Sequence, residues 1–74
     1  MTQHRSSGDV LVPSLQWYRV DMALSQETLR KMAGVSRETV RRGEAGKEIR
    51  LSSVNKLAKA LKVKPSALRQ PPPA

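Results

Sequence analysis

Apolar side chains recur along most of this chain at the three- and four-residue spacing that amphipathic helices require. The first stripe predicts a helix over residues 14–22, which begins just after Pro13. Its apolar face is expected to be Leu11, Leu15, Tyr18 and Met22. Leu24 then brings the chain back into the core.

Two short helices are predicted next, separated by a glycine turn. Ser25 is a favourable N-cap for the first of them. Its buried face is predicted to be Leu29, Met32 and Ala33. Gly34 can adopt the positive φ that ends a helix. Ser36 can cap the next helix, which is predicted to run to about Glu44 and to be terminated by Gly46.

The clearest amphipathic pattern lies further along the chain and predicts a fourth helix. Its apolar face is formed by Leu51, Val54, Leu57, Ala58 and Leu61. Pro65 suits the first turn of a short fifth helix, which lets Leu68 close the core. Strands favour aromatic and β-branched residues, yet the whole chain holds one Trp, one Tyr and no Phe. The predicted fold class is therefore all-α.

The ends of the chain differ from its middle. Residues 1–9 are polar and aperiodic, and they are expected to form a flexible tail that includes His4 and Arg5. The alternative for this tail is an arm that reaches into the minor groove of a nucleic-acid duplex. Residues 70–74 are rich in proline, which cannot continue a helix. One folded domain is thus expected over residues 10–69, because 74 residues are too few for two.

Charge suggests a polyanionic partner. The chain has 14 Lys and Arg against 6 Asp and Glu, for a net charge of +8, which suits nucleic acid or an anionic membrane surface. Residues 49–74 carry six basic and no acidic side chains. Four of the six are Lys56, Lys59, Lys62 and Lys64, which are interpreted as a solvated face that attracts DNA diffusely.

Composition also excludes several classes of function. The chain has no cysteine, and the single His4 cannot form a metal centre alone, so neither a metal nor a cofactor is expected. The longest apolar runs are far shorter than the roughly 20 residues of a membrane span, and a cytoplasmic protein is expected. Asp9 and Asp21 have no nearby acid–base partner, so an enzyme is not expected.

The third predicted helix has the dimensions of a DNA reader. Residues 36–43 make a helix about 12 Å long, and the major groove is ~12 Å wide. Its exposed face is predicted to carry Arg37, Glu38, Arg41 and Arg42, with Val40 turned inward. Arginine can bind guanine with two hydrogen bonds, and glutamate can accept one from cytosine, so G·C-containing half-sites are expected.

These motifs resemble the Cro/phage-repressor (XRE) helix-turn-helix family over about residues 15–68. The resemblance rests on Leu24-Ser25-Gln26, Leu29, Ala33-Gly34-Val35-Ser36, Val40, Glu44-x-Gly46-Lys47 and the segment Leu57-Ala58-Lys59-Ala60-Leu61-Lys62-Val63. It implies a compact five-helix, phage-repressor-like domain with a helix-turn-helix.

The resemblance also implies roles for individual side chains. The positions that read bases in similar repressors match Arg37, Glu38 and Arg42. Those that hold phosphates match Ser25, Gln26, Ser36, Lys47 and Arg50. Thr39 can reach a thymine methyl or a phosphate. Arg41 is a further base-reading position whose register against Arg42 is left open.

The family pattern further pairs Arg19 with Glu44. The resemblance implies a partly buried ion pair between the first and third helices, with the guanidinium also facing a phosphate. Two positions depart from the pattern: Arg30 replaces an alanine, and Gly43 replaces a large aliphatic residue. Trp17 or Met22 is expected to fill the space beside Gly43.

The sequence as a whole predicts a sequence-specific, double-stranded-DNA-binding transcriptional repressor, bacterial or phage-encoded. It is expected to act as a homodimer on a pseudo-palindromic operator whose half-sites lie ~34 Å apart. The alternative is a protein-interaction module on the same scaffold, such as an antitoxin that masks a toxin, or a bridging factor.

Overall fold

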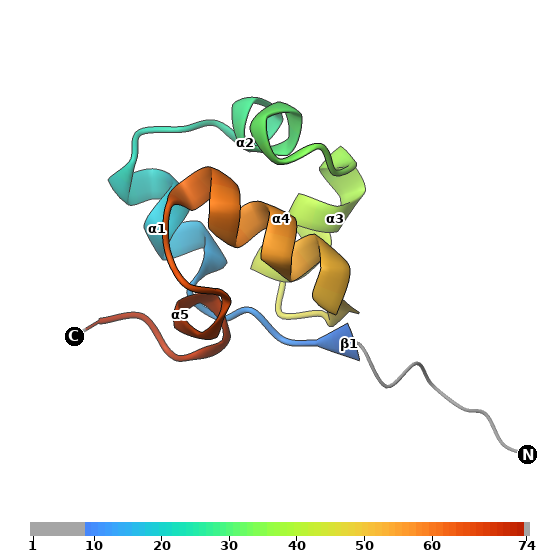
Figure 1. The fold of residues 1–74 in the computed structure, drawn as a ribbon, viewed down its shortest axis with the longest axis vertical. Helices are drawn as coiled ribbons and strands as arrows, with labels where there is room; N and C mark the ends of the chain where they lie inside the picture. The colour runs from blue at the N-terminus through green and yellow to red at the C-terminus, as the bar shows by residue number, and fades with distance from the viewer. Residues whose placement is uncertain (1–8, 74) are drawn as a thin grey trace, which may run out of the picture.

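The computed structural model describes residues 9–73, which form five helices and one two-stranded sheet (Figure 1). The helices are α1 (Leu15–Asp21), α2 (Gln26–Ala33), α3 (Arg37–Glu44), α4 (Leu51–Leu61) and α5 (Pro65–Arg69). The strands are β1 (Asp9–Val10) and β2 (Ile49–Arg50). The five predicted helices and the helix-turn-helix are confirmed.

The small antiparallel sheet was not predicted. Asp9 pairs with Arg50, and Val10 pairs with Ile49. Strands of two residues are too short to show the alternating pattern by which strands are recognised in a sequence. Asp9, which was assigned to the N-terminal tail, therefore belongs to the sheet. The predictions for His4 and Arg5 lie outside the described residues.

Side-chain caps fix both helices of the helix-turn-helix, as the sequence predicts. The hydroxyl oxygens of Ser25 and Ser36 accept hydrogen bonds from the backbone N–H groups of Thr28 and Thr39, each at 3.0 Å. Gly34 ends α2 with a φ of +74°, in the left-handed region that favours glycine. The turn between α2 and α3 is thus set by local chemistry.

The core is built around α4, which crosses the middle of the molecule with α2 and α5 packed against it (Figure 1). Every helix contributes to this core, as does β2. The buried apolar residues are Val12, Leu15, Leu29, Val40, Ile49, Val54, Leu57, Ala58, Leu61 and Leu68.

Four residues that were expected on apolar faces are exposed. Leu11 is 51% exposed because it precedes α1 and helical spacing does not apply to it; Val12 is buried instead. Met22 follows the end of α1, and Leu51 begins α4. Met32 is 51% exposed, and on α2 the neighbouring Ala33 packs against the core.

Gly43 seats α3 directly against the start of the domain. A Cβ at this position would lie 2.9 Å from both Leu15 Cδ2 and Val12 Cγ2, and 3.6 Å from Ile49 Cδ1. These side chains occupy the space that a larger residue would fill. The expectation that Trp17 or Met22 fills it is wrong, since both are exposed.

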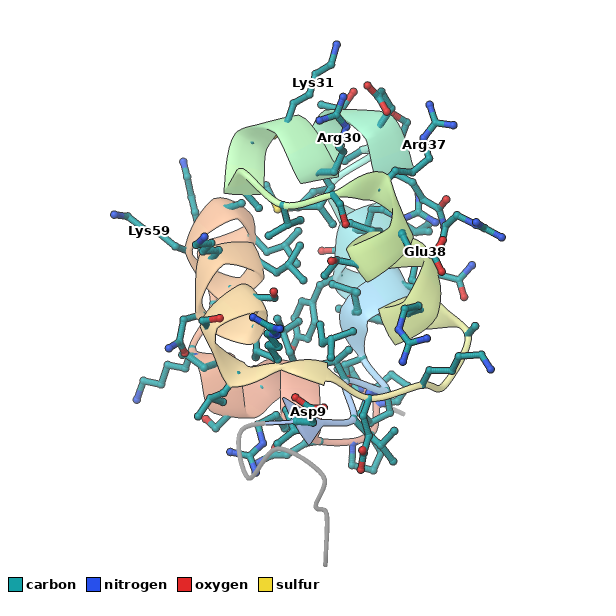
Figure 2. The ribbon with its side chains drawn as sticks, turned by 90° about the vertical axis from the view of Figure 1, so that its right-hand side faces the viewer. Asp9, Arg30, Lys31, Arg37, Glu38 and Lys59 are labelled. Carbon is teal, nitrogen blue, oxygen red and sulfur yellow. The ribbon has the colours of Figure 1, made fainter. Side chains whose placement is uncertain are left out.

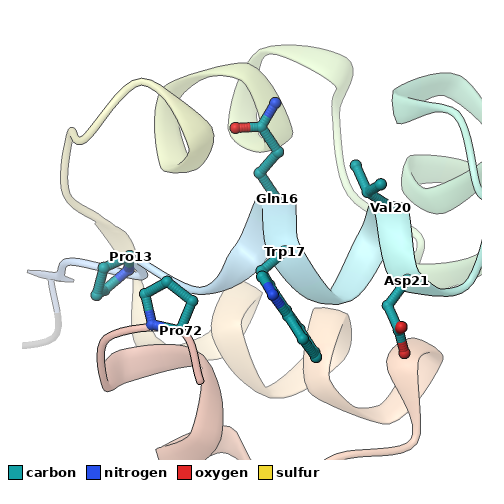
Figure 3. A pocket seen from close by; sticks show the side chains of 6 residues that line it. All are labelled: Pro13, Gln16, Trp17, Val20, Asp21 and Pro72. Carbon is teal, nitrogen blue, oxygen red and sulfur yellow. The ribbon is translucent and has the colours of Figure 1, made fainter. Parts of the chain in front are cut away.

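The segment after α5 returns to the start of α1. The Ser14 hydroxyl donates a hydrogen bond to the Gln70 carbonyl, and the Ser14 N–H donates to the Leu68 carbonyl at 3.3 Å. Pro72 and Trp17 then line one cleft of about 480 Å³, where Gln16 and Trp17 leave α1 on opposite sides (Figure 3). Gln70 and Pro72 of the proline-rich segment thus lie beside the start of α1.

Candidate nucleic-acid interface

Helix α3 has one buried and one exposed face. Val40 is fully buried, whereas Arg37, Glu38, Arg41 and Arg42 are exposed, as the sequence predicts. Figure 2 shows Arg37 and Glu38 on the same side of the molecule. A charged face of this kind on an eight-residue helix fits the width of a major groove.

Several of the predicted site residues line a cleft of about 330 Å³ beside this face. The cleft is lined by Gln16, Gln26, Glu38, Arg41, Arg42, Glu44, Ala45 and Lys47. It therefore joins side chains from α1, α2, α3 and the loop that follows α3. Gln16 could not be predicted from the sequence as a lining residue, because no local pattern indicates that α1 packs beside α3.

A second cleft, of about 230 Å³, lies on the other flank of Arg42. It is lined by Asp9, Thr39, Arg42, Glu48, Ile49, Arg50 and Ser53. Arg42 lines both clefts, and its Nη2 donates a hydrogen bond to the Glu48 carbonyl at 3.3 Å. Arg42 is thus the side chain that links the predicted base-reading and phosphate-holding groups. Neither cleft is lined by Ser25, Ser36 or Arg37.

The Arg19–Glu44 ion pair is present and ties three helices together. Arg19 Nε lies 2.5 Å from Glu44 Oε2, and Nη2 lies 3.0 Å from Oε1. Arg19 Nη1 also donates to the Leu24 carbonyl at 2.8 Å, and Gln26 Nε2 donates to Glu44 Oε1 at 2.9 Å. The side chains of Arg19 and Glu44 are only 13% and 7% exposed. The hydrogen bond to Glu44 raises the pKa of Arg19.

This network uses hydrogen-bond donors of two residues that are predicted to hold phosphates, Arg19 and Gln26. All three nitrogens of the Arg19 guanidinium donate hydrogen bonds to acceptors within the protein. Arg19 therefore mainly stabilises the fold. The Gln26 amide carries two N–H donors, of which the bond to Glu44 uses one. Gln26 can therefore serve the network and a phosphate together.

Glu27 is a further candidate site residue, which was not predicted from the sequence. Its Oε1 lies 3.1 Å from Arg37 Nη2 and its Oε2 lies 2.9 Å from Arg30 Nη2, while Lys31 Nζ is 3.7 Å away. Hydrogen bonds from Arg30 and then Arg37 lower the pKa of Glu27 to about 2. The pair with Arg30 was detectable from its i,i+3 spacing in α2, but the pair with Arg37 exists only because the turn brings α3 beside α2.

Glu27 also explains the unusual Arg30. The guanidinium turns toward this carboxylate and is partly exposed, so Arg30 does not crowd the turn. A second exposed pair joins Glu38 to Arg41, with Arg41 Nη1 at 2.8 Å from Oε1. Exposed ion pairs contribute little free energy, so DNA can replace both the Glu27–Arg37 and the Glu38–Arg41 pairs.

Residues 9–73 show neither a cluster of metal ligands nor a helix that could span a membrane. Among residues 9–73, no three His, Cys, Asp or Glu side chains gather as a metal ion would need. Over the same residues, each helix falls short of the length and apolar character needed to cross a membrane.

Comparison with known proteins agrees with this geometry. The sequence model of a family described as helix-turn-helix matches residues 15–68. The solved structure of a hypothetical transcription factor from Neisseria, NHTF, is 33% identical, with a TM-score of 0.70 over 80% of this chain and 67% of that chain. The restriction-modification controller protein C.AhdI from Aeromonas hydrophila is 34% identical, with a TM-score of 0.66 over 73% of this chain and 83% of that one. No curated protein matches the chain.

The fold, the charged face of α3 and the family match define a DNA-binding domain of the helix-turn-helix class. The chain belongs to the helix-turn-helix family of Cro/phage-repressor (XRE) type, whose members are DNA-binding transcription regulators.

Proposed function

We propose that this protein is a sequence-specific repressor that inserts α3 into the major groove of double-stranded DNA. The observation that carries the proposal is the position of Arg42 between two clefts, whose linings combine amide, hydroxyl and cationic side chains with carboxylates. A guanidinium in that position can bind guanine O6 and N7 while its neighbours hold the flanking phosphates.

The remaining roles follow from the same geometry. Arg37 and Glu38 read bases beside Arg42, while Arg41 and Thr39 make the neighbouring contacts. The phosphate-holding residues are Ser25, Gln26, Ser36, Lys47 and Arg50. Arg37 leaves Glu27 to reach its base, which costs little because the pair is exposed. Arg19 acts mainly through Glu44, by fixing α3 against α1 and α2.

The protein acts as a two-fold homodimer on a pseudo-palindromic operator, with half-sites about one helical turn, ~34 Å, apart. Regulation of this kind is supported by the similar solved proteins, one a hypothetical transcription factor and one a restriction-modification controller.

Sequence selection from a pool of random DNA duplexes tests this proposal. The native chain is expected to enrich an inverted repeat with G·C pairs in each half-site. Arg42→Ala is expected to lose the preference at one base pair per half-site, where a bidentate contact contributes about 1–3 kcal/mol of discrimination. Arg50→Ala is the matched control, because it removes the same charge from a phosphate-holding position and is expected to weaken all sequences alike.

Three outcomes would contradict the proposal. The absence of any enriched sequence would exclude sequence-specific binding. Enrichment of single half-sites would exclude the two-fold dimer. Loss of base preference in Arg50→Ala but not in Arg42→Ala would show that the assigned register is wrong.

A further inference from the structure

A second basic surface lies between α2 and α4. It surrounds a groove of about 600 Å³ that is lined by apolar Met32, Ala33 and Ala60 and by the exposed lysines Lys56, Lys59 and Lys62. We call this the α2–α4 groove. Figure 2 shows Lys59 on the side of the molecule away from Arg37 and Glu38, so a ligand there leaves the exposed face of α3 free.

The charge of this groove is uncompensated. In the part of the chain that the structure describes, the ion pairs formed by Lys and Arg side chains all lie on α1, α2 and α3, and none involves Lys56, Lys59 or Lys62. No acidic side chain lines the groove. By contrast, Arg37 and Arg41 of α3 each have a carboxylate partner. Because Lys56 and Lys59 are three residues apart on one helix, they repel each other until an anionic partner binds.

The apolar lining indicates which kind of anion fits. Met32 is 51% exposed beside these lysines, and with the half-buried Ala33 and Ala60 it gives the groove a small apolar centre and a charged rim, which is the arrangement of protein–protein interfaces. The flexible, polarisable side chain of methionine adapts to different apolar partners. A DNA backbone would satisfy the lysines but would leave Met32 without an apolar partner, so the combination favours a polypeptide.

We propose that the α2–α4 groove binds an acidic segment of a protein partner. A large apolar side chain of that segment packs on Met32 between Ala33 and Ala60, while its carboxylates pair with Lys56, Lys59 and Lys62. The shape of the groove, between two helices, fits an amphipathic helix or an extended strand of comparable width. The protein thereby joins an acidic protein partner to the DNA that α3 binds.

Selection from a phage-displayed library of random sixteen-residue peptides tests the proposal on the native chain. Enriched peptides are expected to carry an excess of Asp and Glu together with at least one Leu, Ile, Phe or Trp. Synthetic copies, measured by fluorescence anisotropy, are expected to bind Lys59→Glu about tenfold more weakly than the native chain. Lys64→Glu is the matched control, because it makes the same charge change on an exposed lysine outside the groove and is expected to change binding less than twofold.

A third variant separates packing from charge. Met32→Ser keeps every charge and is expected to weaken the same peptides, because it removes their apolar contact; circular dichroism of each variant checks that the fold is kept. The proposal is overturned if no acidic peptide is enriched, if Lys59→Glu and Lys64→Glu act equally, or if Met32→Ser has no effect. It is also overturned if Lys59→Glu instead abolishes binding of a random duplex or self-association of the chain, since nucleic acid or a second copy would then occupy the groove.

Discussion

Gly43 shows how one residue can set the position of a helix. Glycine costs about 0.5–1 kcal/mol in a helix interior relative to alanine, because its unfolded backbone has more freedom. In return, α3 approaches so closely that Leu15 and Val12 occupy the position of a side chain. The close approach therefore fixes the position of α3 against the start of the domain.

Gly43→Ala is predicted to destabilise the domain by about 1 kcal/mol. Alanine regains about 0.5–1 kcal/mol of helix propensity, but overpacking a core at contacts of 2.9 Å costs roughly 1–3 kcal/mol. Urea denaturation followed by Trp17 fluorescence measures the free energy of unfolding. The same substitution in a Val12→Ala background is expected to cost less, because one of the two closest atoms is gone. Additive effects, or a more stable Gly43→Ala, would disprove the overpacking.

Single residues also show which features of the fold can be predicted from the sequence and which cannot. The positive φ of Gly34 and the caps at Ser25 and Ser36 could be predicted because each depends on its own few neighbours. The closest neighbours of Gly43 could not be predicted, because Val12 and Leu15 come from a segment far earlier in the sequence. Met32 satisfied the helical spacing, yet it is exposed and lines the α2–α4 groove.

The connection between helices depends on Glu44. This carboxylate accepts two hydrogen bonds from Arg19 of α1 and one from Gln26 of α2, so α3 is held in position by both earlier helices. A family pattern indicates such a pair, but the sequence alone did not indicate that Gln26 and the Leu24 carbonyl complete the network. Removing one member leaves a mostly buried charge without its partner.

Glu44→Ala is predicted to lower the free energy of unfolding by about 3 kcal/mol. This value is at the lower end of the range for breaking a buried pair, because the Arg19 side chain is 13% exposed and can recover some hydration. Urea denaturation at neutral pH measures it. Glu38→Ala removes an exposed carboxylate from the same helix and is expected to cost less than about 1 kcal/mol. Equal costs for the two variants would show that burial adds nothing to the Glu44 network.

Over the entire molecule the net charge is +8, and basic side chains gather on two separate surfaces, the exposed face of α3 and the α2–α4 groove. The basic residues of α3 lie among carboxylates and amides, whereas the lysines of the α2–α4 groove have no acidic neighbour in its lining. Composition predicted a polyanionic partner and the excess of positive charge in the C-terminal half. It could not predict that Lys59 faces away from Arg37, because that depends on how α4 packs against α2.

The salt dependence of DNA binding distinguishes these two surfaces. Each phosphate contact releases condensed counterions and adds about 0.9 to the slope of log affinity against log salt concentration. If the proposed interface is correct, Lys47→Gln is predicted to reduce the slope for a random duplex by about 0.9, because Lys47 lines the cleft beside α3. Lys59→Gln makes the same change in net charge on the opposite side and is predicted to leave the slope unchanged. Equal reductions would mean that DNA contacts the α2–α4 groove as well, and a slope near zero in the native chain would exclude phosphate binding altogether.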